Sequence, residues 1–335
     1  MKVFITGIAG FLGMHLARAF LEEGWEVGGN DNLIGGYREN VPPAAKFFQV
    51  DCIQREELVQ AMKGSDVVYH CAATPHEGLS VFSPALVTKN VYLATATALS
   101  AAISTGVKRF IFCSSMARYG TNRVPFTEDL EPRPQDPYGI AKVSSETLIK
   151  LLAQVHGFEY VIAVPHNIYV PGQKYDDPYR NVVAILINRM LQGNQPYIYG
   201  DGTQRRCFSY ITDVVAPLTA MATSLKVVGE VINVGPDREL VTINELAETI
   251  AEIIGFPLEP IALPPRPQEV RDANCSADKA RRLLDYEPQC SLREGLEKMV
   301  AWVRECGPRP FIYHLELEII NKLTPRAWTD QIFNK

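Results

Sequence analysis

The residues that decide the fold are 2–13, KVFITGIAGFLG, where a short apolar run passes into three glycines spaced three positions apart. Val3 to Thr6 has the β-branched and aromatic content of a buried strand. An apolar periodicity typical of a helix continues from Phe11 to Glu23. A strand that turns through glycines into a helix is a unit of a parallel sheet covered by helices. We therefore predict an α/β protein with a doubly wound parallel sheet.

The same alternation of strand and helix continues through the first half of the chain. The near-continuous apolar content of the later runs is typical of strands that are buried on both faces. We predict one domain over residues 1–165. Its further strands are expected at Trp25–Gly29, Lys46–Val50, Asp66–Cys71, Arg109–Cys113 and Tyr160–Val164, and its further helices at Arg55–Met62, Ser83–Thr105 and Pro137–His156.

The second half reads as a smaller α/β lobe over residues 166–306. Within it, Val231 to Val234 is a strand that we expect to rejoin the main sheet, and Ile243 to Ile254 is an amphipathic helix. Residues 307–335 form a tail that begins with a Gly-Pro-Arg-Pro break and continues as an apolar segment. Its role is open: packing against the body is favoured over a partner or membrane-surface helix.

The composition of the 335-residue chain points to a globular protein that binds small molecules. It has 47% hydrophobic and 21% charged residues, which excludes disordered, collagenous and coiled-coil chains. The formal net charge of −5 gives no basic patch for nucleic acid or anionic lipid. No apolar run approaches the ~20 residues that span a bilayer, so we expect no membrane partner. Seven cysteines without a C-x-x-C pair predict a reducing, cytoplasmic location and no metal site.

The glycine stretch has the chemistry of a phosphate cradle. Gly7, Gly10 and Gly13 permit a tight turn and a close approach of the backbone, while the first helical turn, with Phe11 and Leu12, presents unpaired N–H groups to a pyrophosphate. The spacing is G-x-x-G-x-x-G, and it differs from the G-x-G-x-x-G of the usual dinucleotide fingerprint. We predict that this turn holds the pyrophosphate of a dinucleotide.

Carboxylates at strand ends indicate which dinucleotide is bound. Asp31 comes 24 residues after Gly7 (31 − 7), at the end of the second strand. A carboxylate there accepts hydrogen bonds from ribose hydroxyls and repels a 2′-phosphate, which favours NAD over NADP. Asn32 follows it, and Asp51 and Cys52 follow the third strand. These three are predicted to flank the adenosine, although an Asp at a strand end is as often a turn residue.

A tyrosine and a lysine are placed to handle a proton. Tyr138 and Lys142 are four residues apart on one face of a helix that begins after Asp136 as N-cap. A nearby ammonium favours the phenolate and lowers the tyrosine pKa. Ser114 and Ser115 end the fifth strand, at the carboxyl edge where ligands of open α/β sheets bind. We predict Ser115, Tyr138 and Lys142 as catalytic residues that take a proton from a substrate hydroxyl.

Taken in order, the glycine triplet, Asp31, the two serines and the Tyr138/Lys142 pair resemble the extended short-chain dehydrogenase/reductase family. The likeness is to its NAD-dependent nucleotide-sugar epimerase/dehydratase group, which includes the UDP-glucose 4-epimerases, and it covers about residues 1–305. It implies a Rossmann-like domain with tightly bound NAD and a second lobe that binds a nucleotide sugar.

Three segments of the second half make the resemblance more specific. Residues 165–169, PHNIY, are similar to the family segment whose Asn, here Asn167, contacts the nucleotide sugar. Residues 200–208, GDGTQRRCF, and the RPQEV stretch that follows Pro265 are similar to segments that place Arg206 and Arg266 on the substrate diphosphate. Guanidinium groups suit that role because they engage phosphate oxygens bidentately.

The resemblance implies further contacts and an assembly. Helices at about 83–105 and 137–156 form the dimer interface in the family, so we expect a homodimer. Besides Tyr138 and Lys142, the residues implied to contact NAD are Ala72, Ala73, Asn90, Ser114 and Pro165.

Departures from the family pattern narrow the reaction. Family 4,6-dehydratases carry an acidic pair just after the catalytic hydroxyl residue, where this chain has Met116 and Ala117. Without an acid and a base there, elimination of water is disfavoured. Ala273 aligns with a family position that limits sugar size, and a small residue there would admit N-acetylated or carboxylated sugars.

We therefore expect an NAD-dependent 4-epimerase of a nucleotide sugar, most simply a UDP-hexose, working through a transient 4-keto sugar. Two alternatives stay open: a dehydratase or another enzyme with a 4-keto intermediate, and a non-catalytic NAD-binding scaffold. The sequence fixes neither the nucleotide base nor the sugar, because sugar choice depends on pocket shape.

Overall fold

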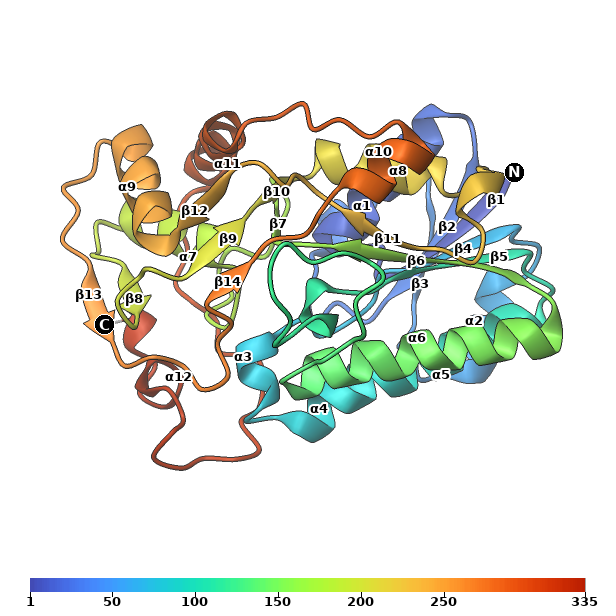
Figure 1. Cartoon of the computed structure of the whole chain (residues 1–335), viewed down its shortest axis with the longest axis horizontal. Coiled ribbons are helices and arrows are strands. Elements are labelled where there is room, and N and C mark those ends of the chain that lie inside the picture. Colours follow the sequence, from blue (N-terminus) through green and yellow to red (C-terminus); the bar gives the residue numbers. More distant parts are fainter. Residues whose placement is uncertain (335) are drawn as a thin grey trace.

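The computed structural model describes residues 1–334, and its centre is a seven-stranded parallel sheet (Figure 1). The strand order is β11-β6-β5-β4-β1-β2-β3, so the chain winds outward in both directions from β1 and β4. This confirms the predicted doubly wound sheet and the return of residues 231–234 beside β6. The strands are β1 (Lys2–Thr6), β2 (Glu26–Asp31), β3 (Lys46–Gln49), β4 (Val67–His70), β5 (Arg109–Cys113), β6 (Glu159–Pro165) and β11 (Val231–Val234).

Helices cover both faces of this sheet, which explains why its inner strands β1, β4 and β5 are almost wholly buried. One layer, below the sheet in Figure 1, holds α2 (Arg55–Met62), α4 (Pro84–Thr88), α5 (Ala94–Ser104) and α6 (Pro137–His156). The other layer holds α1 (Phe11–Glu22), α8 (Thr212–Ala220) and α10 (Asp278–Leu284).

Helix α6 begins where the sequence predicts. The side chain of Asp136 accepts a hydrogen bond from the Gly139 N–H at 2.9 Å, and Pro137 occupies the first helical position, where its missing N–H costs nothing. The helix ends at Gly157, whose left-handed φ of 71° suits glycine. This start fixes the direction in which Tyr138 leaves the helix.

The helix predicted over Ser83–Thr105 is interrupted. A π-helical turn at Lys89–Leu93 separates α4 from α5, so one extra residue enters the turn that carries Asn90. The run Pro84–Ser104 matches a membrane span by length and composition, with a mean hydropathy of 1.2 over an 18-residue window, so the expectation that no apolar run would do so was wrong. It packs against α2 and α6 as a layer of the fold, as the core helix of a globular protein does.

The second lobe combines three small sheets with helices that pack on them. Thr242 and Ser291 each begin a helix with a reciprocal capping box, closed by Glu245 and Glu294. The paired strands are β7 (Ile168–Tyr169) with β10 (Ser209–Tyr210), β9 (Arg205–Cys207) with β12 (Leu240–Thr242) and β14 (Asp272–Ala273), and β8 (Tyr197–Tyr199) with β13 (Ile261–Leu263). The helices are α7 (Val182–Leu191), α9 (Ile243–Ile254) and α11 (Leu292–Cys306).

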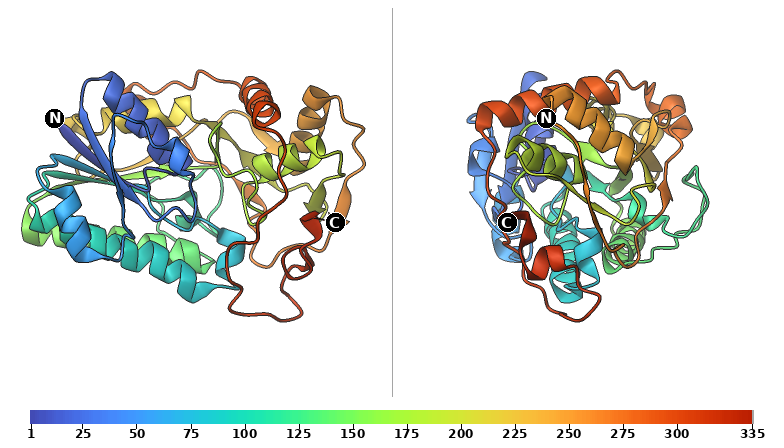
Figure 2. Two further views of the ribbon diagram at one scale, coloured as in Figure 1. Left: turned by 180° about the vertical axis from the view of Figure 1, so that it is seen from behind. Right: turned by 90° about the vertical axis from the view of Figure 1, so that its left-hand side faces the viewer.

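The tail folds back over the body, as the favoured reading of its role predicted. After α11 it runs as an extended strap into a short helix, α12 (Arg326–Thr329), which a 3₁₀ turn at Ile332–Asn334 follows (Figure 2). It buries Phe311, Trp328 and Phe333 in a cluster with residues of α3 (Glu77–Ser80) and the segment before α7.

Candidate active site

One cavity of about 410 Å³ lies at the carboxyl ends of the sheet strands, between the sheet and the second lobe. Every residue that the sequence predicted to be catalytic, cofactor-binding or substrate-binding lines it. They are Gly7, Gly10, Phe11, Leu12, Gly13, Asp31, Asn32, Asp51, Cys52, Ala72, Ala73, Asn90, Ser114, Ser115, Tyr138, Lys142, Pro165, Asn167, Arg206 and Arg266. Ala273, by contrast, is buried in β14 outside the cavity, which gives no support to the expected effect on sugar size.

The glycine turn is possible only with glycines. Gly7 has φ of 73°, and a Cβ there would lie 2.9 Å from the backbone of Ala72. A Cβ on Gly13 would lie 2.2 Å from the carbonyl oxygen of Gly7. Helix α1 starts from Gly10 with no side-chain cap, so its first N–H groups are left for a ligand. These residues fit a dinucleotide pyrophosphate.

Asp31 closes the adenosine end of the cavity. Its two carboxylate oxygens accept hydrogen bonds from the N–H groups of Ala9 at 3.0 Å and Leu33 at 2.7 Å, which hold it in place. Burial raises the pKa of this carboxyl. Asp51 accepts from the Asn32 amide at 2.9 Å, so the two predicted adenosine neighbours also contact each other. The donor and acceptor set fits the ribose and base of NAD.

Tyr138, Ser115 and Lys142 meet at the centre of the cavity. Burial raises the pKa of the Tyr138 phenol, while a hydrogen bond with Ser115 and the charge of Arg180 act to lower it. The Lys142 Nζ donates to the Cys113 carbonyl at 2.6 Å and lies 5.8 Å from the tyrosine ring centroid. Burial lowers the pKa of Lys142 to about 8. Ser115 and Arg180 therefore favour the phenolate, while the Lys142 ammonium is held by the Cys113 carbonyl.

Two residues predicted to contact the cofactor, Ser114 and Asn90, use their side chains in hydrogen bonds with other side chains of the protein. Ser114 donates its hydroxyl to Glu146 at 2.5 Å, and Glu146 forms a buried ion pair with Arg118 at 3.1 Å. The Asn90 amide donates to Thr74 at 3.0 Å. These interactions position the strand end and the π-helical turn that face the cavity.

The two arginines predicted for the diphosphate come from different segments: Arg206 lies on β9, and Arg266 lies in the loop between β13 and β14. Arg266 pairs with Glu269 at 2.7 Å and stacks over the Tyr199 ring at 4.7 Å. Its Nε is buried without a partner. Arg206 donates to backbone carbonyls, among them that of Arg271 at 3.0 Å. Both arginines therefore have N–H donors left for a ligand: the Nε of Arg266 has no partner, and the bonds of Arg206 use three of its five N–H groups.

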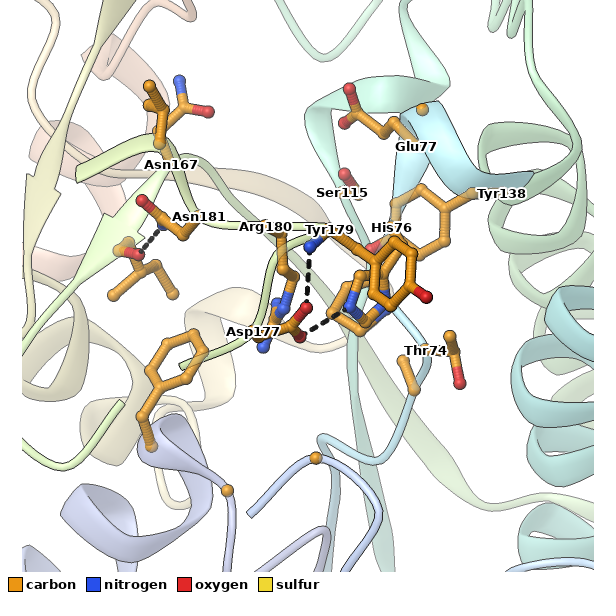
Figure 3. A pocket seen from close by; sticks show the side chains of 18 of the residues that line it. Thr74, His76, Glu77, Ser115, Tyr138, Asn167, Asp177, Tyr179, Arg180 and Asn181 are labelled. Atoms are coloured by element: carbon orange, nitrogen blue, oxygen red, sulfur yellow. Dashed lines mark hydrogen bonds and ion pairs between the residues drawn. The ribbon is translucent and has the colours of Figure 1, made fainter. Parts of the chain in front are cut away.

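Glu77 is a site residue that sequence reasoning missed. It is the first residue of α3, and Figure 3 shows it on the same side of the cavity as Ser115 and Tyr138. Its side chain is exposed to the cavity, yet protein surrounds it so closely that burial raises its pKa to about 7. The charge of Asp136 acts in the same direction, and Arg206 acts against it.

A second feature that the sequence did not predict is a buried cluster of His76, Asp177 and Arg180, whose charge acts on Tyr138. His76 lies 2.9 Å from Asp177, and Arg180 is buried beside both (Figure 3). Burial lowers the pKa of His76, so the neutral ring donates to the carboxylate. Burial acts to raise the pKa of Asp177, but His76 and Arg180 lower it overall. Since 101 residues separate His76 from Asp177, no local motif could reveal the pair.

A family model described as "NAD dependent epimerase/dehydratase family" matches residues 3–235. The chain belongs to this family. A putative UDP-glucose 4-epimerase of Methanocaldococcus jannaschii is 34% identical, over 90% of this chain and 98% of its own length. A UDP-N-acetyl-α-D-glucosaminuronate decarboxylase of Bacillus cytotoxicus is 31% identical, over 91% of this chain and 98% of its own.

Two solved structures show the same architecture. The UDP-glucose 4-epimerase of Thermotoga maritima, with UDP-glucose, matches with a TM-score of 0.86 at 34% identity, over 91% of this chain and 99% of its own. The UDP-glucuronic acid 4-epimerase of Bacillus cereus, with UDP-glucuronic acid and NAD, matches with a TM-score of 0.86 at 31% identity, over 92% of this chain and 100% of its own. These relatives are matched along almost their whole length, but about a tenth of this chain has no counterpart in the match.

Within residues 1–334, no group of three or more His, Cys, Asp or Glu side chains is arranged to hold a metal ion. The polar groups that line the cavity include the Tyr138 phenol, the Ser115 hydroxyl, the Lys142 ammonium and the guanidinium groups of Arg206 and Arg266.

Proposed function

We propose that this chain is an NAD-dependent 4-epimerase of a nucleotide sugar, with a UDP-hexose as substrate. The observation that carries the proposal is that a single cavity is lined by Tyr138 with Ser115 and by Arg206 with Arg266. A nucleotide hexose needs both pairs, since its C4 hydroxyl gives up a proton and its diphosphate binds cationic groups. In this reading residues 1–165 supply most of the NAD site and residues 166–306 most of the sugar site.

The protein's own residues would manage the proton. Tyr138 takes the proton of the C4 hydroxyl and returns it after the sugar has turned, while Ser115, in hydrogen-bond contact with the phenol, orients the hydroxyl. Lys142, held by the Cys113 carbonyl, lies where the nicotinamide ribose would bind. NAD⁺, when bound, supplies the hydride acceptor and its positive charge favours the phenolate.

The diphosphate would be held by side chains that are already in place. Arg206 is fixed by backbone carbonyls, and Arg266 is supported by the Tyr199 ring. Charge-assisted hydrogen bonds from guanidinium groups are among the stronger polar contacts, at about 1.5–3 kcal/mol each. Such bonds from Arg206 and Arg266 would hold the nucleotide sugar by its diphosphate. The hexose would stay free to rotate near Tyr138, as epimerisation requires.

A second candidate is dehydration through the same 4-keto sugar. Glu77 favours it, because a carboxyl with a pKa of about 7 in the sugar space is an acid and base that the sequence did not provide at Met116 and Ala117. Product mass distinguishes the two reactions, since epimerisation preserves it and dehydration removes water.

We further propose a cytoplasmic homodimer. Three large apolar side chains on one face of α6 are exposed, at 53% for Ile140, 55% for Leu151 and 67% for Val155, with Leu93 beside them at 48%. A second copy would cover this stripe. All seven cysteines are free, and the sulfurs of Cys71 and Cys113 lie 3.6 Å apart unbonded, which suits a reducing compartment. Light scattering should give twice the monomer mass.

The proposed function is tested with a panel of UDP-, dTDP-, GDP- and CDP-sugars, read by chromatography and mass spectrometry. We expect conversion of UDP-glucose to a product of equal mass. Tyr138→Phe should lower kcat by about three orders of magnitude, in the range of general acid–base catalysis, with NAD and UDP binding retained. Normal turnover by that variant, or no conversion of any nucleotide sugar by the wild type, would overturn the proposal.

A further inference from the structure

The C-terminal strap, residues 308–334, lines the cavity as well as covering the body. His314, Trp328 and Phe333 are all part of the cavity wall. Relatives that are matched along 98–99% of their own length cover only 90–91% of this chain, and the family match already begins at Val3. The strap is therefore the part of the site that these relatives do not supply.

The strap is fastened to both sides of the cavity. On the second lobe, the Asn188 amide donates to the Arg309 carbonyl at 2.9 Å, and Arg189 donates to the Phe333 carbonyl at 2.7 Å. On the sheet side, the Glu318 carboxylate accepts from the N–H groups of Ala85 at 2.9 Å and Leu86 at 2.6 Å, at the start of α4. Attachments at both sides hold the wall in one position.

The aromatic residues of the strap pack against the part of the cavity wall that Tyr179, Tyr197 and Arg266 form. The Phe333 ring lies 5.5 Å from that of Tyr197. Trp328 packs 5.6 Å from the Tyr179 ring, and its edge reaches Gly78, where a Cβ would meet it at 3.6 Å and Arg266 at 3.5 Å. The buried hydroxyl of the neighbouring Tyr199 has no partner.

This arrangement determines which part of the ligand meets the strap. A sugar at Tyr138 and a diphosphate at Arg206 and Arg266 leave the nucleoside to extend past the arginines, toward Tyr199 and Phe333. The partly exposed Tyr197 and Tyr199 rings there suit a flat base, because stacking on such a surface is worth about 1–3 kcal/mol. The buried Phe333 ring supports Tyr197 from the strap. We propose that the strap forms one wall of the nucleoside subsite and sets how tightly this chain holds a nucleotide sugar.

The proposal rests on the proposed function, and its test separates the two. Trp328→Ala and Phe333→Ala are compared with wild type for UDP affinity by calorimetry and for UDP-glucose kinetics. We expect the Kd for UDP and the KM for UDP-glucose to rise about tenfold, with kcat within twofold and NAD content unchanged. The change is expected in KM because the nucleoside is held alike in ground and transition states.

Two variants of the strap serve as controls. Leu315→Ala removes a side chain buried in the same cluster but outside the cavity, and Ile320→Ala removes an exposed one. Leu315→Ala should lower the melting temperature without changing the Kd for UDP, and Ile320→Ala should change neither.

The outcomes that overturn the proposal are distinct. Equal loss of UDP affinity in Leu315→Ala and Phe333→Ala would show that the strap acts only by holding the fold. Unchanged affinity in folded Trp328→Ala and Phe333→Ala, with wild-type epimerase activity, would remove the strap proposal and leave the function. A wild type that binds no nucleotide sugar would remove both.

Discussion

The two ends of the cavity are built by different means. The cofactor end is made of backbone: a turn of glycines between β1 and α1, with Asp31 at the end of β2. The sugar end is made of long side chains, Glu77, Arg206 and Arg266, together with aromatic residues of the strap. A backbone site lies within one short segment of sequence, whereas a side-chain site is assembled only when distant segments pack together. Each end should therefore respond to mutation in its own way.

The largest effect is expected at the backbone site. In Gly13→Ala the new methyl group would lie 2.2 Å from the Gly7 carbonyl oxygen, so the turn has to open. We expect at least a hundredfold loss of NAD affinity, measured by fluorescence titration of protein stripped of its cofactor, and a corresponding loss of activity.

Gly24→Ala is the matched control for that variant. Gly24 also has a positive φ, of 79°, but a Cβ there meets nothing within 4 Å. It should cost about 1 kcal/mol of stability and leave NAD affinity unchanged. Equal loss of NAD in both variants would show that general destabilisation, rather than the closed turn, explains the effect.

A smaller effect is expected at the side-chain end. Arg266→Met keeps an unbranched, flexible side chain, although a shorter one, and removes the charge that stacks over Tyr199. We expect the KM for UDP-glucose to rise about 10- to 100-fold while bound NAD is retained, because one or two charge-assisted hydrogen bonds are lost.

Arg205→Met tests whether position rather than charge is responsible. Arg205 is half exposed and pairs with Asp272 at 2.8 Å, outside the cavity. Its loss should leave KM within twofold. If Arg205→Met and Arg266→Met raised KM alike, the clamp assignment would be wrong and a general effect of positive charge would replace it.

The smallest effect is expected at Glu77. Because its pKa is about 7, the carboxyl is mostly neutral at pH 6 and mostly charged at pH 8. A negative charge on Glu77 would repel the carboxylate of UDP-glucuronate, whereas UDP-glucose has no carboxylate. Two unit charges about 4 Å apart in water repel each other by about 1 kcal/mol. Glu77→Gln should therefore improve the kcat/KM ratio of UDP-glucuronate to UDP-glucose about three- to tenfold at pH 8.

The pH series of the wild type is the control for that prediction. Its ratio should fall as pH rises from 6 to 8, whereas the ratio for Glu77→Gln should stay level, because glutamine does not titrate. Identical pH profiles for the two proteins would falsify a role for the Glu77 charge in sugar choice.

The sequence predicted the backbone-built end of the cavity better than the end that is built of side chains. The sheet, the glycine turn, Asp31 and the Tyr138/Lys142 face depend on local spacing, and the structure places each where the spacing predicted. Glu77 carries no such signal, since its short loop resembles the start of an ordinary helix. The hydrogen-bond partner of Lys142 could not be predicted either, because it is a backbone carbonyl, that of Cys113 on β5, which only the packing of α6 on the sheet brings near.

The strap has a consequence for the order in which the site is completed during synthesis. Ser83 bonds to the carbonyl of Glu316, a contact between residues 233 positions apart. The central sheet needs nothing beyond Val234, so it can form while the strap is still unmade. A nascent chain would therefore bind NAD before it could bind a sugar nucleotide. Formation of the nucleoside wall would then be the last step in folding to an active enzyme.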